Sequence, residues 1–103
     1  MSAFVVGEIE ISDEHRKDFE NVFLVQAHRE LEEAGAKIVG GGFDNAAALT
    51  GMPPKNRFVV IEFPTKAALE KWWNSPAGAW ARENIKKYAN AGNRLIAAYE
   101  ATE

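Results

Sequence analysis

The chain has 103 residues, a formal net charge of −3 and no cysteine. This length fits a single core, so we predict one domain over residues 1–103. The negative charge disfavours nucleic-acid binding, which needs a concentrated basic surface, and the lack of cysteine excludes disulfides and thiolate chemistry. No apolar segment is long enough to cross a membrane, and the beginning of the chain is acidic, unlike a signal peptide, with Glu8, Glu10, Asp13 and Glu14. We therefore expect a cytoplasmic protein with neither nucleic acid nor membrane as a partner.

The first half of the chain predicts a strand, a long helix and a second strand. Residues 3–11 are rich in β-branched side chains, which favours a strand. Ser12 can cap a helix that runs to about Glu33, before the stop signal of Gly35. Its apolar residues recur at helical spacing: Phe19, Val22, Phe23, Ala27, Leu31 and Ala34. Residues 36–39 favour a short strand that leads into three glycines, which permit a bulge or bend.

The second half repeats this order. Residues 46–49 either continue the second strand or form a hairpin arm, and residues 51–56 have the composition of a turn. The clearest strand is 57–63, and Pro64 ends it. Two helices are predicted, at 66–73 with Thr65 as cap and from Pro76 to about Asn90 with Ser75 as cap. The last predicted strand covers residues 94–100.

The order strand, helix, strand, strand, helix, strand is typical of one fold class. It predicts a ferredoxin-like α+β sandwich, a four-stranded antiparallel sheet with its helices on one face. Such a sheet normally has a polar outer face, yet the strands here carry apolar residues on both sides. Phe58 and Val60, for example, alternate with Val59 and Ile61. We therefore predict a homodimer that covers the outer face, since large apolar patches are rare on monomers.

One stretch resembles a known family. The segment MPPKNRFVVIEFP (52–64), the later WNSP (73–76) and the pair Arg94-Leu95 resemble the domain of unknown function 1330 family. The resemblance implies a dimeric α+β barrel, in which two ferredoxin-like sheets close into one barrel. The wider superfamily contains cofactor-free monooxygenases, isomerases, decarboxylases, haem-linked enzymes and ligand binders. Family members usually have Glu-Tyr after Ser-Pro, where this chain has Ala77-Gly78.

Two residues are candidates for proton transfer. Glu62 lies inside an apolar strand, where a carboxylate either finds a cation or takes up a proton. It can act as a general base or form an ion pair with Arg57, Arg94 or a partner chain. His15, in the first turn of the long helix, can act as acid or base at a cavity mouth or be a surface residue. His28 is expected in solvent, and no spacing of ligands indicates a metal site.

The stretch WWNSP indicates either a pocket wall or a packed corner. Trp72 and Trp73 point about 100° apart on a helix, so one is expected to pack with Leu69 and the other to border a cleft. Asn74 ends one helical piece and offers an amide beside an indole. The predicted ligand-binding residues are therefore Trp72, Trp73, Asn74, Arg57 and Glu62.

Three functions remain open at the level of the sequence. The leading hypothesis is a homodimer that binds a small organic molecule in an internal pocket, with no cofactor. The second is a cofactor-independent enzyme of the monooxygenase or isomerase type. The third is a non-catalytic module that only dimerises.

Overall fold

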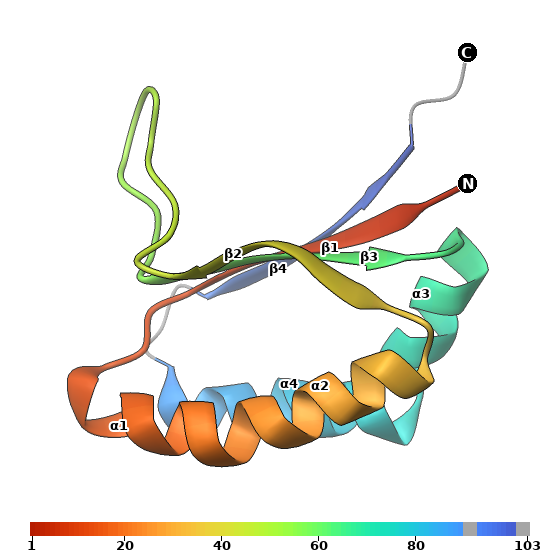
Figure 1. Cartoon of the computed structure of the whole chain (residues 1–103), viewed down its shortest axis with the longest axis horizontal. Helices are drawn as coiled ribbons and strands as arrows, with labels where there is room; N and C mark the ends of the chain where they lie inside the picture. The colour runs from red at the N-terminus through yellow and green to blue at the C-terminus, as the bar shows by residue number, and fades with distance from the viewer. Residues whose placement is uncertain (90–92, 101–103) are drawn as a thin grey trace.

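The computed structural model describes residues 1–89 and 93–100, and within them a sheet lies over a layer of helices (Figure 1). The elements are β1 (Ala3–Ile9), α1 (Asp13–Asp18), η1 (Phe19–Phe23), α2 (Leu24–Glu33), β2 (Lys37–Phe43), β3 (Arg57–Phe63), α3 (Lys66–Trp73), α4 (Pro76–Tyr88) and β4 (Arg94–Tyr99). None of the helices in this described part is long and apolar enough to cross a membrane.

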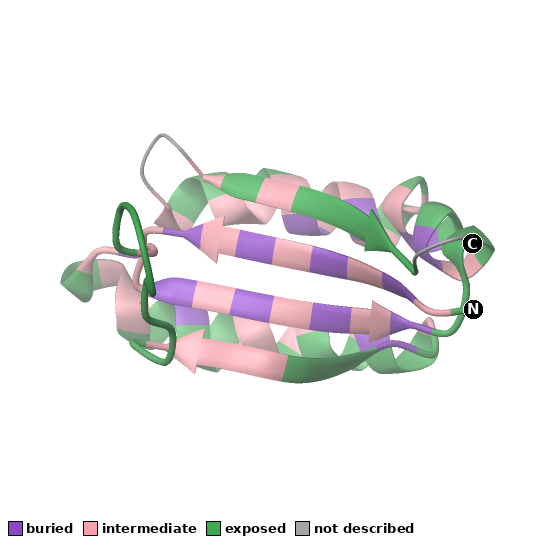
Figure 2. Cartoon of the chain, turned by 90° about the horizontal axis from the view of Figure 1, so that it is seen from above, coloured by how far each residue is buried: buried purple, intermediate pink, exposed green. Residues whose placement is uncertain are grey.

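The sheet has four antiparallel strands in the order β2-β3-β1-β4 (Figure 2). Val5 of β1 pairs with Ile61 on one side and Ala97 on the other. The helices lie on one face of this sheet, as Figure 1 shows. The predicted ferredoxin-like α+β sandwich is therefore confirmed.

The long predicted helix is interrupted by one wide turn. The segment η1 is a π-helix between the two α-helical pieces α1 and α2. A π turn holds one residue more than an α turn, so it changes the helical phase of the residues that follow. Val22, predicted to be inside, is 57% exposed, while Leu24 packs against the core. The predicted apolar stripe was wrong at this position.

The second strand is longer than predicted and runs through its glycines. β2 extends to Phe43, with a shift of register between Ile38 and Gly40. Gly41 has a φ of 87°, and a Cβ on it would meet the carbonyl of Phe58, so this position requires glycine. Residues 46–49 form no strand. They belong to a loop that rises from the sheet on the side away from the helices (Figure 1).

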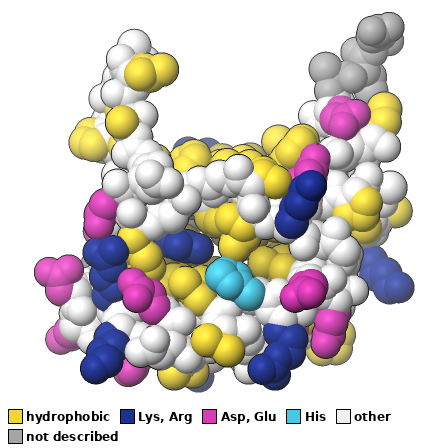
Figure 3. Space-filling model, viewed as in Figure 1, with side chains coloured by type: hydrophobic (Ala, Val, Ile, Leu, Met, Phe, Trp, Pro, Cys, Tyr) yellow, Lys and Arg dark blue, Asp and Glu magenta, His cyan; other side chains and the backbone are white. Residues whose placement is uncertain are grey.

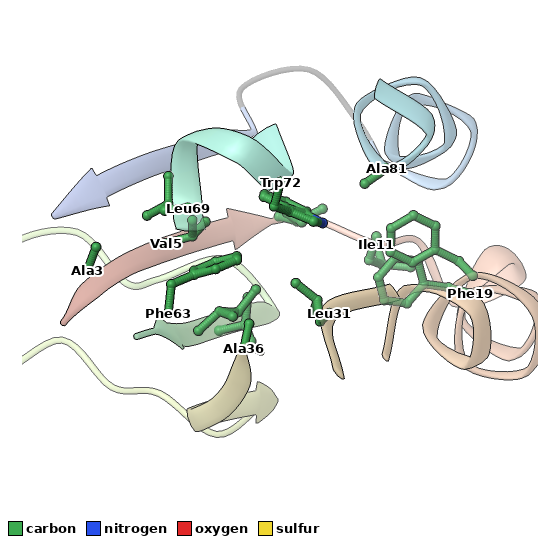
Figure 4. Packing of buried hydrophobic residues seen from close by; sticks show 14 residues of the cluster. Ala3, Val5, Ile11, Phe19, Leu31, Ala36, Phe63, Leu69, Trp72 and Ala81 are labelled. Atoms are coloured by element: carbon green, nitrogen blue, oxygen red, sulfur yellow. The ribbon is translucent and has the colours of Figure 1, made fainter. Parts of the chain in front are cut away.

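The core lies between the two layers. It is built from the inward-facing residues of β1 and β3 and from side chains of every helical segment except α1 (Figure 4). Phe19, Phe63 and Ile11 are its most deeply buried large side chains. The predicted end of the last helix at Asn90 falls outside the described residues; α4 itself ends at Tyr88.

Candidate ligand-binding cavity

A cavity of about 70 Å³ lies between the sheet and the helices. Its walls come from all four strands of the sheet and from η1, α2, α3 and α4. Figure 3 shows hydrophobic side chains inside a hollow between the two layers. Small side chains help to create this space, because Ala27, Ala77 and Ala81 line the cavity among positions that carry large rings.

Three stacked aromatic rings form part of the cavity wall. Phe19 and Phe23 stack with centroids 4.8 Å apart, and Phe23 stacks on Trp80 at 5.2 Å with the rings only 8° from parallel. Trp72 adds a further ring and packs against Phe63 at 5.4 Å. Offset stacks of this kind fix the positions of the rings. The cavity therefore has an apolar boundary with flat rings along one part of it.

The one arginine in the cavity wall is Arg57, at the start of β3. It is only 8% exposed, and its guanidinium lies 5.2 Å from the centre of the Phe43 ring. Burial lowers the pKa of Arg57, while the more distant charge of Glu20 raises it. An arginine still remains protonated at every physiological pH. Among the described residues, its side chain has neither a hydrogen bond nor an ion pair.

The helix α2 brings two more polar residues to the cavity, His28 and Glu30. His28 is exposed, as expected from the sequence, but it also lies three and four residues from Leu31 and Leu24 and shares their face. Glu30 Oε1 accepts a hydrogen bond from Gln26 Nε2 at 3.2 Å. Its other oxygen, Oε2, is buried and has no hydrogen-bond partner. Residues 24, 27, 28 and 31 recur at helical spacing, and this spacing was the sequence signal for the face that lines the cavity. The predicted apolar stripe contained Ala27 and Leu31 but not His28.

The two residues proposed for proton transfer lie outside the cavity. Glu62 is on the outer face of the sheet, 27% exposed, with its carboxylate 3.6 Å from Lys37 Nζ. Arg57 points to the opposite face, and Arg94 pairs in the sheet with Glu8, so neither is the partner of Glu62. Side chains along a strand alternate between the two faces of the sheet, and residues 57 and 62 are separated by an odd number of positions. Arg57 and Glu62 therefore lie on opposite faces.

His15 is also outside the lining of the cavity. Its ring contacts Tyr88 edge-on at 6.3 Å, and its Nε2 lies 3.2 Å from a carboxylate oxygen of Glu14. Tyr88 in turn meets Phe19, which does line the cavity, so His15 is one ring removed from it.

The stretch WWNSP forms a packed corner whose two indoles have different surroundings. Trp72 is buried in the core with Leu69, and it lines the cavity. Trp73 is half-buried beneath the guanidinium of Arg82, 4.3 Å from its ring centre, and borders a separate and more open hollow against β4. Asn74 is exposed and donates its side-chain amide to the Glu70 carbonyl at 2.9 Å.

The predicted ligand-binding residues are therefore divided between three places. Arg57 and Trp72 share the cavity, Trp73 and Asn74 lie at the corner beside it, and Glu62 is on the other face of the sheet. Within the described residues, no group of three or more acidic or histidine side chains is placed to hold a metal ion.

These features define a small α+β protein of ferredoxin-like fold with an apolar cavity between its sheet and its helices. The chain belongs to the family "Domain of unknown function (DUF1330)", whose model matches residues 2–99. No curated protein gives a significant match to the sequence.

Several solved structures share the fold. A protein of unknown function from Rhodopseudomonas palustris has a TM-score of 0.68 at 15% identity, with 99% of this chain and 84% of that chain covered. A protein from Caulobacter crescentus, named a "putative antibiotic biosynthesis monooxygenase", has a TM-score of 0.68 at 16% identity, covering 99% and 91%. A similarly named protein from Nitrosomonas europaea has a TM-score of 0.63 at 8% identity, covering 94% and 88%. Identities this low establish the fold and nothing of the activity.

Proposed function

We propose that this protein binds a small organic molecule in the cavity between sheet and helices, and that it acts as a homodimer. The observation that carries the proposal is the cavity itself, an apolar space with an aromatic wall. Protein interiors are normally close-packed, so an apolar space of this kind is a candidate ligand site. A bound molecule would fill the space.

The outer face of the sheet supports the dimer. Phe4 and Val6 of β1 lie beside Val60 of β3, and Ile96 of β4 is 43% exposed. No described element covers this face, although the loop after β2 rises beside it (Figure 1). The loop carries further exposed apolar residues, among them Leu49, which is 98% exposed. A second sheet packed on this face would remove these side chains from water, which is the main driving force for association.

A cofactor-independent enzyme is the second candidate, and two observations favour it. Some proteins of the same fold carry the monooxygenase name given above, and two titratable residues, His28 and Glu30, are among those that line the cavity. General acid–base catalysis needs such a group within hydrogen-bond reach of the substrate. Under this proposal, these two residues replace Glu62 and His15 as the first candidates for proton transfer. A non-catalytic dimerisation module is the third candidate, and it gives the cavity no role.

Native mass spectrometry of the purified protein tests these functions directly. Denaturing analysis then identifies any molecule that is released. We expect a dimer that carries a small organic molecule. The variant Ala81→Leu, which places a larger side chain in the cavity wall, should form the same dimer without the molecule. A matched exposed substitution, Ala67→Leu in α3, should leave the molecule bound. A monomer would contradict the dimer, and a molecule retained by Ala81→Leu would contradict the cavity as its site.

A further inference from the structure

We propose that the molecule bound in the cavity is a small amphiphile, with a short, uncharged apolar body inside the cavity and a single polar end group at the mouth beside His28. This inference rests on the proposed function, because it names the chemical class of the molecule that the cavity binds and its orientation. Two observations carry it: the apolar surface of the cavity, and the position of the exposed residues among those that line it.

The surface of the cavity is wholly apolar, although three of its lining residues have polar side chains. Arg57, His28 and Glu30 contribute only apolar atoms to this surface. A polar group carried into the space would give up its hydrogen bonds to water and find no partner there, which weakens binding. The part of the ligand inside the cavity is therefore uncharged and apolar, and the removal of that part from water drives binding.

The mouth of the cavity lies between α2 and the edge strand β2. Among the described residues that line the cavity, His28 on α2 and Ile38 on β2 are the exposed ones. Figure 3 shows the hollow from the side of these two elements, with a histidine at its edge. The register shift of β2 begins at Ile38, and an irregularity of this kind lets an edge strand bend locally. A molecule can therefore enter here, and a polar end group left at the mouth meets water and the imidazole of His28.

The register of the sheet gives the direction and the size of the apolar body. Ile38, Ile61 and Val5 pair directly across β2, β3 and β1, and all three line the cavity. Neighbouring strands lie about 4.8 Å apart, so this row extends roughly 10 Å from the mouth to its inner end. The free volume of about 70 Å³ is roughly half of the ~150 Å³ that accommodates benzene in an engineered cavity. A chain of a few carbon atoms therefore fits directly, across the strands and with its methyl end toward Val5.

A series of primary alcohols tests this class by NMR titration of the full chain. From 1-propanol to 1-hexanol, the affinity should rise about fourfold with each methylene group until the chain fills the cavity. The diol 1,4-butanediol should bind at least about tenfold more weakly than 1-butanol, because one of its two hydroxyls must enter the apolar space. The variant Ala81→Leu, which fills part of the cavity, should lose the binding of 1-butanol, and the exposed control Ala67→Leu should keep it.

Intermolecular nuclear Overhauser effects give the orientation of the bound alcohol. The methyl end of 1-butanol should contact the methyl groups of Val5 or Ile61, and the carbon that bears the hydroxyl should contact the ring of His28. The reversed order would overturn the inference. Contacts with Trp73 and Ile96, which line the separate hollow against β4, would overturn it as well.

The remaining outcomes separate this inference from the proposed function. Equal affinities for the diol and 1-butanol, or no binding of any alcohol, would overturn the apolar amphiphile as the ligand class. The proposed function would still stand if the native mass spectra show a molecule that Ala81→Leu no longer carries. The comparison of diol with alcohol and the Overhauser effects use the native chain, so they hold even if Ala81→Leu does not fold.

Discussion

Gly78 lies where two backbone carbonyl groups leave no room for a side chain. It is buried near the start of α4, and an ideal Cβ built on it would lie 2.4 Å from the carbonyl oxygen of Trp72 and 2.6 Å from that of Trp73. Neither carbonyl is free to move. The oxygen of Trp72 accepts a hydrogen bond from Ser75 Oγ at 2.6 Å, and that of Trp73 accepts one from Arg82 Nη1 at 2.6 Å.

The substitution Gly78→Ala should therefore destabilise the protein strongly. Overpacking costs about 1–3 kcal/mol, and the loss of two hydrogen bonds adds about 0.5–1.5 kcal/mol each. The better helix propensity of alanine returns only about 1 kcal/mol. We expect a net loss of about 3 kcal/mol, which lowers Tm by roughly 12–24 °C in a domain of this size.

Thermal unfolding followed by circular dichroism, at one protein concentration, measures this effect. Gly40→Ala is the matched control, because its Cβ would lie 3.9 Å from the side chain of Val60, an ordinary contact. That variant should be neutral or slightly more stable. A Tm for Gly78→Ala within a few degrees of the control would refute the steric argument.

Three further substitutions test the packing of other parts of the molecule. Asn56→Ala removes a side chain that accepts from the Ile11 amide at 2.8 Å and donates to the Ile11 carbonyl at 2.6 Å; it should cost about 2 kcal/mol in urea unfolding, and an unchanged midpoint would contradict this. Trp80→Ala removes the ring stacked on Phe23 and should cost about 3–5 kcal/mol in the same assay; a loss below 1 kcal/mol would mean that the ring is not part of the core. Val60→Lys places a charge on the outer sheet face and should give a folded monomer in sedimentation experiments; a dimer of unchanged affinity would exclude that face as the interface.

Most of the fold could be predicted because local signals mark its boundaries. The bounds of β3 and α3 agree with the prediction, since Pro64 ends the strand and Thr65 begins the helix. The Thr65 side chain accepts from the Ala68 amide at 3.0 Å, and Ser75 caps α4 in the same way through Gly78. Caps of this kind depend on neighbouring residues only, so the sequence is sufficient to find them.

The length of β2 could not be predicted in the same way. A run of three glycines indicates a turn or a bend when its composition alone is considered. In the structure these glycines pair with Phe58, Val59 and Val60 of the neighbouring strand. The hydrogen-bonded ladder of β3 therefore holds them in the sheet, and that contact comes from a segment far away in the sequence.

The candidate site was predicted only in part, because a cavity is what remains after the helices pack on the sheet. Arg57 and Trp72 were placed in one candidate set, and both line the cavity. Glu62 entered the same set as a carboxylate in an apolar strand, but strand parity puts it on the outer face with Lys37. Which face of the sheet holds the cavity depends on the helix packing, and no pattern within the strand carries that information.

The π turn at η1 determines which residues of α2 reach the cavity, and a deletion can test this. A π turn contains one residue more than an α turn. Deleting that residue restores α geometry without rotating the helices on either side. Deletion of the exposed Asn21 should therefore leave Leu31 in the core and change the free energy of unfolding by less than about 1 kcal/mol.

The matched control is deletion of Arg29, which is also exposed and lies in the regular helix α2. This deletion rotates the following residues by about 100°. It removes Leu31 from the core at a cost of about 3 kcal/mol or more. Urea unfolding of the two deletion variants measures the difference. Equal losses would mean that η1 is not a separable insertion, and that the phase of α2 is set by its packing against α4 and the sheet instead.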